Sequence, residues 1–140
     1  KSMLTDYSYV WPEGEEAAAV FFEMLSNTGA DYIHTTERYA TEPTFGEDGP
    51  SLMEAAVKYV TDNTVVIANG SLGTPDAARQ AIDDGADLLT LGTSALANPD
   101  WPSRVVAGKE LAQFDRTQLL EPKATISDEE LSPGISSVDD

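Results

Sequence analysis

Two short runs of small residues have the chemistry of an anion-binding site. Asn69-Gly70-Ser71 comes just after the branched apolar run at residues 65–67, and Gly92-Thr93-Ser94 follows the predicted strand at residues 88–91, which is leucine-rich. Glycine lets a ligand approach the backbone closely, and amide N–H groups near the start of a helix attract phosphate. We therefore predict a phosphate site that uses no lysine, formed by Asn69, Gly70, Ser71, Gly92 and Thr93. Tight turns from strand to helix would need the same glycines, so the spacing alone leaves both interpretations open.

Other residues that could carry chemistry are few. The chain has no cysteine and a single histidine, His34, which argues against a zinc cluster. His34 lies in the run Tyr32-Ile33-His34-Thr35-Thr36, where we expect a hydrogen-bonded structural role in a strand rather than proton transfer. Carboxylate pairs could be drawn almost anywhere among 25 acidic residues, so none is given an acid-base role. We predict no metal site and name no catalytic residue.

Composition limits the classes of partner. The 140 residues carry 25 acids against 8 bases, a net charge of -17, which disfavours nucleic acid and anionic membrane surfaces. No apolar run approaches the roughly 18 residues of a membrane helix, and no signal peptide is recognisable. Abundant acids with little lysine suggest a salt-rich, halophilic setting in which screening relieves repulsion. We expect a cytoplasmic protein.

Capping signals mark where helices begin. Thr74-Pro75-Asp76 combines a hydroxyl N-cap, a proline at the first helical position and an acid near the positive end of the helix dipole. Ser51 and Glu54 have the spacing of a capping box. The predicted order is helix 15–27, strand 31–37, a helix from residue 52, strand 65–68, helix 75–83, strand 88–91, and a helix that Asn98-Pro99-Asp100 caps and that ends near Gly108.

This alternation predicts an α/β fold with parallel strands, because each connection is long enough to cross over. The strands are apolar on both faces, so helices should cover one face and packed side chains the other. Even with a further strand at residues 1–5, the strands are too few to close a barrel. We therefore predict the C-terminal half of a (β/α)8 TIM barrel over residues 1–120, with a small doubly wound sheet as the alternative. Residues 121–140 are predicted to be an acidic tail.

A resemblance to a known family sharpens this prediction. The segments YIHTTE, IANGS, GADLLTLG, ANPDWPSRV and FDR occur in this order. Together they resemble the phosphate-binding end of the barrel in the old yellow enzyme family. This family comprises the NADH:flavin oxidoreductases, which are FMN-binding (β/α)8 barrels. The resemblance covers about residues 1–120, and ANPDWP is its most specific part. It implies that the chain holds strands six to eight of the barrel and the end of strand five.

The resemblance also implies a cofactor and roles for named residues. The Gly70 and Ser71 amides would hold the FMN phosphate, Asn69 would shape the loop, and Gly92 would belong to a second phosphate loop. Where the family often has an arginine after that glycine, this chain has Thr93, so phosphate affinity should be weaker or the charge supplied from elsewhere. NAD(P)H would reduce the flavin and a small-molecule acceptor would reoxidise it. The catalytic residues would lie in the other half, so this chain alone is expected to be inactive.

Two other functions stay open at the level of sequence. One is a different phosphate-binding barrel enzyme, such as an aldolase or synthase, although Lys58, Lys109 and Lys123 lie on no predicted strand where a Schiff base would form. The other is a non-catalytic half-barrel that serves binding or assembly. Because a half-barrel leaves strand edges and an apolar inner face open, we expect the N-terminal half of a barrel or a second copy as partner. In a homo-oligomer, strand 31–37 or 88–91 would lie near the contact.

Overall fold

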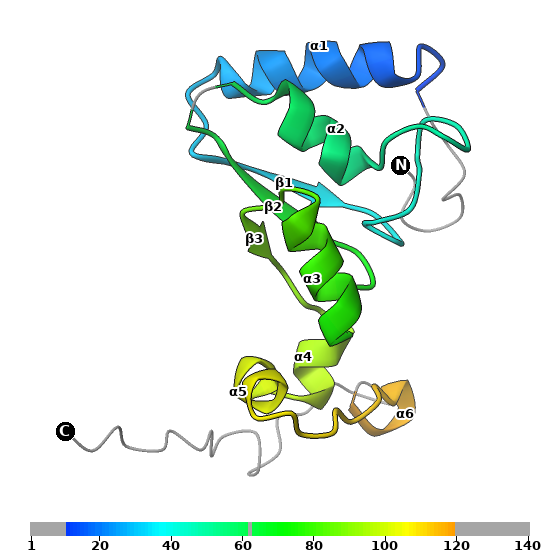
Figure 1. The fold of residues 1–140 in the computed structure, drawn as a ribbon, viewed down its shortest axis with the longest axis vertical. Coiled ribbons are helices and arrows are strands. Elements are labelled where there is room, and N and C mark those ends of the chain that lie inside the picture. Colours follow the sequence, from blue (N-terminus) through cyan, green and yellow to red (C-terminus); the bar gives the residue numbers. More distant parts are fainter. Residues whose placement is uncertain (1–10, 62, 120–140) are drawn as a thin grey trace, which may run out of the picture. The chain divides into compact units, whose positions relative to one another are not determined.

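The computed structural model describes residues 11–61 and 63–119 (Figure 1). The chain divides into two compact units, Lys1–Leu91 and Gly92–Asp140, and each is described by itself. The predicted strand at residues 1–5 and the predicted tail at 121–140 lie outside the described residues. Among the residues that are described, no helix is long and apolar enough to cross a membrane.

The first unit alternates helices and strands. In chain order its elements are α1 (Glu15–Ser26), β1 (Tyr32–Thr36), α2 (Leu52–Tyr59), β2 (Val65–Asn69), α3 (Pro75–Asp83) and β3 (Leu88–Leu89). The type and order of all six predicted elements are confirmed. The third strand was predicted over residues 88–91 and is shorter. β2 ends at Asn69, and Gly70, which the register would place opposite Leu91, turns away with a φ of 141°. Leu91 therefore has no neighbouring strand to pair with.

The three strands form one parallel sheet in the order β1-β2-β3. Its two faces differ in burial. Side chains that point to the covered face are buried, as for Ile33 and Val66, whereas Tyr32 and Leu88 on the other face remain 58% and 55% exposed. In Figure 1, α1 and α2 lie on the same side of β1. A doubly wound sheet has helices on both faces, so the described residues match a segment of a barrel wall instead.

The core lies between the covered face of the sheet and its helices. Large side chains are few among the buried apolar residues, and alanines are many, which lets helices approach the strands closely. The buried apolar residues are Ala18, Phe22, Ile33, Ala40, Met53, Ala55, Ala56, Val66, Ala68, Leu72, Ala78, Ala81 and Ala86. This small-residue core fixes the distance between the strands and the helices that follow them.

The predicted helix caps are present in the first unit. Ser51 Oγ accepts a hydrogen bond from the Glu54 amide at 3.1 Å, and Glu54 Oε2 accepts one from the Ser51 amide at 2.8 Å. Thr74 Oγ1 accepts a bond from the Ala77 amide at 3.2 Å, as the sequence predicted. Both caps satisfy amides that the first turn of a helix leaves without partners.

An ion pair joins α1 and α2. Glu15 Oε1 lies 2.8 Å from Lys58 Nζ and 2.8 Å from the Tyr59 hydroxyl. The hydrogen bond from Lys58, and next that from Tyr59, holds the pKa of Glu15 below its usual value. Since the folded-state pKa is lowered, this contact supports the fold at neutral pH and is lost as the pH falls through the lowered value.

The second unit contains the short helices α4 (Thr93–Ala97), α5 (Trp101–Val106) and α6 (Arg116–Leu119). The predicted helix that ends near Gly108 is confirmed as α5. Its predicted cap differs, because Asp100 makes no side-chain capping bond and its Oδ1 accepts from Arg104 Nε at 2.6 Å instead. We predicted Gly92-Thr93-Ser94 as a loop, but α4 begins at Thr93, where the Gly92 carbonyl accepts bonds from the Ala95 and Leu96 amides.

Candidate functional site

Gly70 is buried where the chain leaves β2, and its lack of a side chain has a structural cause. Its φ is 141°, which residues with a side chain rarely adopt. A Cβ atom at this position would lie 2.5 Å from the Glu37 carbonyl oxygen and 3.0 Å from the Ala40 nitrogen. Close packing of two backbone segments therefore accounts for this glycine whether or not a ligand binds.

Hydrogen bonds join the loop after β2 to the turn after β1. The Glu37 amide donates to the Asn69 carbonyl and the Ala40 amide to the Gly70 carbonyl, each at 3.0 Å. Ser71 has a φ of 55° and donates its hydroxyl proton to the Arg38 carbonyl at 2.7 Å. The hydroxyl of Ser71 is thus used within the fold, so an anion at this loop would be met by amide N–H groups.

The amides of this loop could donate hydrogen bonds to an anion. Among the described residues, no hydrogen bond is donated by the amides of Gly70, Ser71 and Leu72. Gly70 and Ser71 both have positive φ, and successive amides in a turn can form an anion-binding concavity. The loop leads into α3, which begins at Pro75, so the positive end of the helix dipole lies on the side of the loop. The residues present therefore fit a bound phosphate group.

His34 on β1 and Asn69 on β2 both form hydrogen bonds with Thr90, which follows β3. His34 Nε2 lies 2.9 Å from Thr90 Oγ1, and Asn69 Nδ2 donates to the Thr90 carbonyl at 2.9 Å. The hydrogen bond predicted for His34 is present, and its structural role stays a prediction. This network connects β1, β2 and the residue after β3, and so fixes Asn69 at the start of the candidate loop. Among the described residues, no group of three or more His, Cys, Asp or Glu side chains could hold a metal ion.

The other two predicted site residues belong to the second unit. Gly92 is exposed, has a φ of -93°, and has no atom within 4 Å of the position of a Cβ. Thr93 is exposed and opens α4. The structure thus places Asn69, Gly70 and Ser71 together in the first unit, and the participation of Gly92 and Thr93 stays a prediction.

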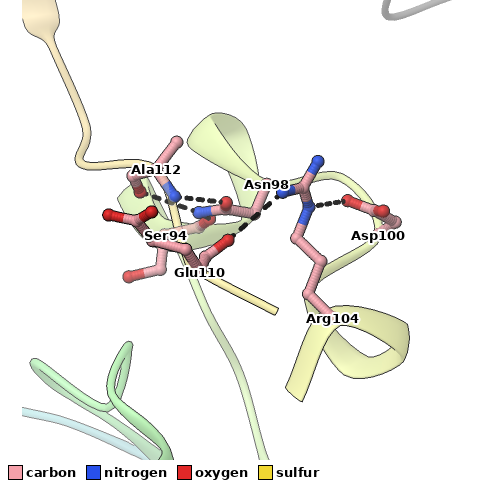
Figure 2. A network of polar contacts seen from close by, with 6 residues as sticks. All are labelled: Ser94, Asn98, Asp100, Arg104, Glu110 and Ala112. Carbon is pink, nitrogen blue, oxygen red and sulfur yellow. Dashed lines mark hydrogen bonds and ion pairs between the residues drawn. The ribbon is translucent and has the colours of Figure 1, made fainter. Parts of the chain in front are cut away.

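Asn98 carries a set of contacts that sequence reasoning did not anticipate (Figure 2). The residue is 1% exposed, and its Nδ2 donates to the carbonyls of Ser94 and Ala112 at 3.1 and 2.9 Å. Its Oδ1 accepts from the Ala112 amide at 2.8 Å. Asn98 therefore ties α4 to the segment after α5. The only sequence signal was Asn-Pro, which indicated a helix cap.

Relatives of this chain include two oxidoreductases. NADH:fumarate oxidoreductase of Klebsiella pneumoniae strain 342 is 31% identical over 105 residues, which are 69% of this chain and 11% of that protein. The flavin oxidoreductase hxnT of Emericella nidulans is 28% identical over 97 residues, or 69% of this chain and 23% of that protein. Both alignments cover more than half of this chain.

A solved structure is also similar to this chain. The old yellow enzyme homologue from Zymomonas mobilis superimposes with a TM-score of 0.58 and 25% sequence identity, over 80% of this chain and 30% of that one. The chain resembles part of an old yellow enzyme. The predicted family resemblance and the predicted segment of an α/β barrel are confirmed by this likeness.

The old yellow enzyme-like chain also has relatives of another kind. An N-acetylmannosamine-6-phosphate 2-epimerase from Cutibacterium acnes is 41% identical over 76 residues, which are 53% of this chain and 33% of that protein. The chain spans about a tenth to a third of the length of these curated relatives. No family model matches it.

Proposed function

We propose that this chain is a segment of an FMN-dependent oxidoreductase and that the Asn69-Gly70-Ser71 loop binds the FMN phosphate. The observation that carries the proposal is the row of amides from Gly70 to Leu72, which donate no hydrogen bond among the described residues. The row follows β2, and ligands of parallel α/β folds bind at the carboxyl ends of strands. The likeness to an old yellow enzyme homologue and a flavin oxidoreductase supports flavin as the ligand.

In this proposal the loop binds and orients the cofactor. The amides of Gly70, Ser71 and Leu72 would donate to phosphate oxygens, and the positive end of α3 would favour the negative charge. Bound FMN would supply hydride chemistry, with NAD(P)H as reductant and a small-molecule acceptor as oxidant. The residues of this chain would hold and orient the cofactor, and we assign no catalytic role to them.

Flavin titrations test this proposal directly. We expect the chain to bind FMN at least ten-fold more tightly than riboflavin, because riboflavin lacks the phosphate, and a hydrogen bond to a charged group is worth about 1.5–3 kcal/mol. Quenching of flavin fluorescence measures both affinities under the same conditions. Equal affinity for the two flavins would contradict the proposed phosphate site. If neither flavin bound, the proposal that this chain binds flavin would be wrong.

The epimerase relative supports a second candidate, a barrel segment that binds a sugar phosphate. The same amides could bind that phosphate, since they recognise the anion and not the group attached to it. N-acetylmannosamine 6-phosphate added to the flavin titration separates the two candidates. Tight binding of the sugar phosphate together with weak binding of FMN would favour the epimerase-like function.

We also propose that a second copy, or the remaining part of a barrel, covers the exposed face of the sheet in the first unit. Tyr32 and Leu88 are more than half exposed on that face, which is unusual for a parallel sheet. For the chain alone we expect association that grows with salt, because screening reduces repulsion between copies with a net charge of -17. Sedimentation velocity over a salt series measures this association. A compact, stable monomer at every salt concentration would contradict the proposal that the exposed face of the sheet needs a partner.

A further inference from the structure

We propose that Arg38 supplies the positive charge for the phosphate group bound at the Asn69-Gly70-Ser71 loop. The inference rests on the proposed function and deepens it, because it names a residue outside the loop that sets the strength and selectivity of binding. Three observations lead to it: the charge around the loop, the position of the Arg38 backbone, and the exposure of its side chain.

The loop needs a cation because its surroundings are negative. The whole chain has a net charge of -17. Close to the loop, the Glu37 carboxylate accepts a hydrogen bond from Thr44 Oγ1 at 2.6 Å, and Asp76 lies in the first turn of α3. A phosphate held by neutral amides alone would have to bind against these charges. One guanidinium beside the loop would offset much of that repulsion.

The described part of the first unit has basic residues at three places, and they differ in their relation to the loop. Lys58 lies 2.8 Å from Glu15 in the ion pair between α1 and α2. Arg79 is exposed on α3. Arg38 is the one whose own backbone contacts the loop, since its carbonyl accepts the Ser71 hydroxyl at 2.7 Å.

The contacts on either side of Arg38 fix its backbone against the candidate site. Glu37 donates to the Asn69 carbonyl and Ala40 donates to the Gly70 carbonyl, both at 3.0 Å. The Arg38 side chain itself is exposed, and its guanidinium carbon lies 5.4 Å from the centre of the Tyr39 ring. A rigid anchor with a long, planar, permanently charged side chain is well suited to bidentate contact with phosphate.

The test compares two arginine variants with two flavins. Arg38→Ala keeps the carbonyl that binds Ser71, so the loop should stay folded, and circular dichroism checks this. We expect Arg38→Ala to weaken FMN binding about ten-fold and to leave riboflavin binding unchanged, because only FMN carries the phosphate. Arg79→Ala is the matched control, since it removes the same charge from the same unit. Arg38→Lys should restore part of the lost FMN affinity.

The outcomes distinguish this inference from the proposed function. If the wild-type chain prefers FMN over riboflavin and Arg38→Ala keeps that preference, Arg38 is not the cation, and the phosphate site stands without it. The inference also fails if Arg38→Ala and Arg79→Ala weaken FMN binding equally. That result would indicate that only the net charge of the chain affects FMN affinity. If the wild-type chain shows no preference for FMN, the proposed function fails and this inference fails with it.

Discussion

Gly70→Ala is expected to destabilise the first unit by about 3 kcal/mol or more. Two costs add at this position. The φ of 141° is strained for any residue with a side chain, and the new Cβ would lie 2.5 Å from the Glu37 carbonyl oxygen. Because that oxygen belongs to the backbone, the clash could be relieved only if the turn after β1 moved away from the loop. The two hydrogen bonds that Asn69 and Gly70 accept from this turn would be strained as well.

Urea unfolding in a background with one tryptophan measures this effect. The chain has two tryptophans, and Trp101→Phe leaves Trp11, which contacts Phe21 and Phe45 in the first unit at ring distances of 4.9 and 6.2 Å. The fluorescence of Trp11 then reports on the first unit.

Two other glycines provide matched controls for this substitution. Gly29→Ala should cost only the backbone strain, about 1 kcal/mol, because Gly29 has a φ of 80° but nothing within 4 Å of a Cβ. Gly92→Ala should cost little in either unit, because Gly92 has neither a positive φ nor a close neighbour. If Gly70→Ala were no more costly than Gly29→Ala, the close packing of the loop against the turn after β1 would be wrong.

The helix starts could be predicted because their signals are local. A hydroxyl N-cap and the amide that it binds lie three residues apart, so Thr74 with Ala77 and Ser51 with Glu54 can be recognised in the sequence alone. β1 and β2 could also be predicted, because each has β-branched or aromatic residues within five positions. The small residues after β2 mark the end of that strand, and their role in binding a ligand stays a prediction.

The remaining features depend on contacts between distant residues. The glycine at position 70 is required by Glu37 and Ala40, about thirty positions earlier in the chain. The turn that these residues form also brings Arg38 to the loop, which no spacing in the sequence reveals. The helix α4 has only five residues and no capping side chain, so it leaves no periodic pattern to read. The sequence therefore predicts helix caps and strands, whereas the contacts around the loop after β2 depend on the folded chain.

Asn98→Ala is expected to destabilise the second unit by about 2 kcal/mol, because it removes three hydrogen bonds made by a buried side chain and each is worth about 0.5–1.5 kcal/mol. The change removes both the donor to the Ser94 and Ala112 carbonyls and the acceptor for the Ala112 amide (Figure 2). Trp11→Phe leaves Trp101, at the start of α5, as the fluorescent reporter of this unit. Urea unfolding of that variant, with and without Asn98→Ala, gives the difference.

Two further substitutions separate the loss of the Asn98 contacts from a general loss of polar side chains. Asn98→Asp keeps an oxygen for the Ala112 amide but turns an oxygen toward the Ser94 and Ala112 carbonyls, so it should destabilise strongly at neutral pH. Acid should reduce this penalty, because a protonated carboxyl can again donate to a carbonyl. Arg104→Ala removes exposed contacts to Asp100 and to the Glu110 carbonyl, and should change little. If Asn98→Ala were as mild as Arg104→Ala, the second unit would be held together by its apolar contacts and not by the buried carboxamide.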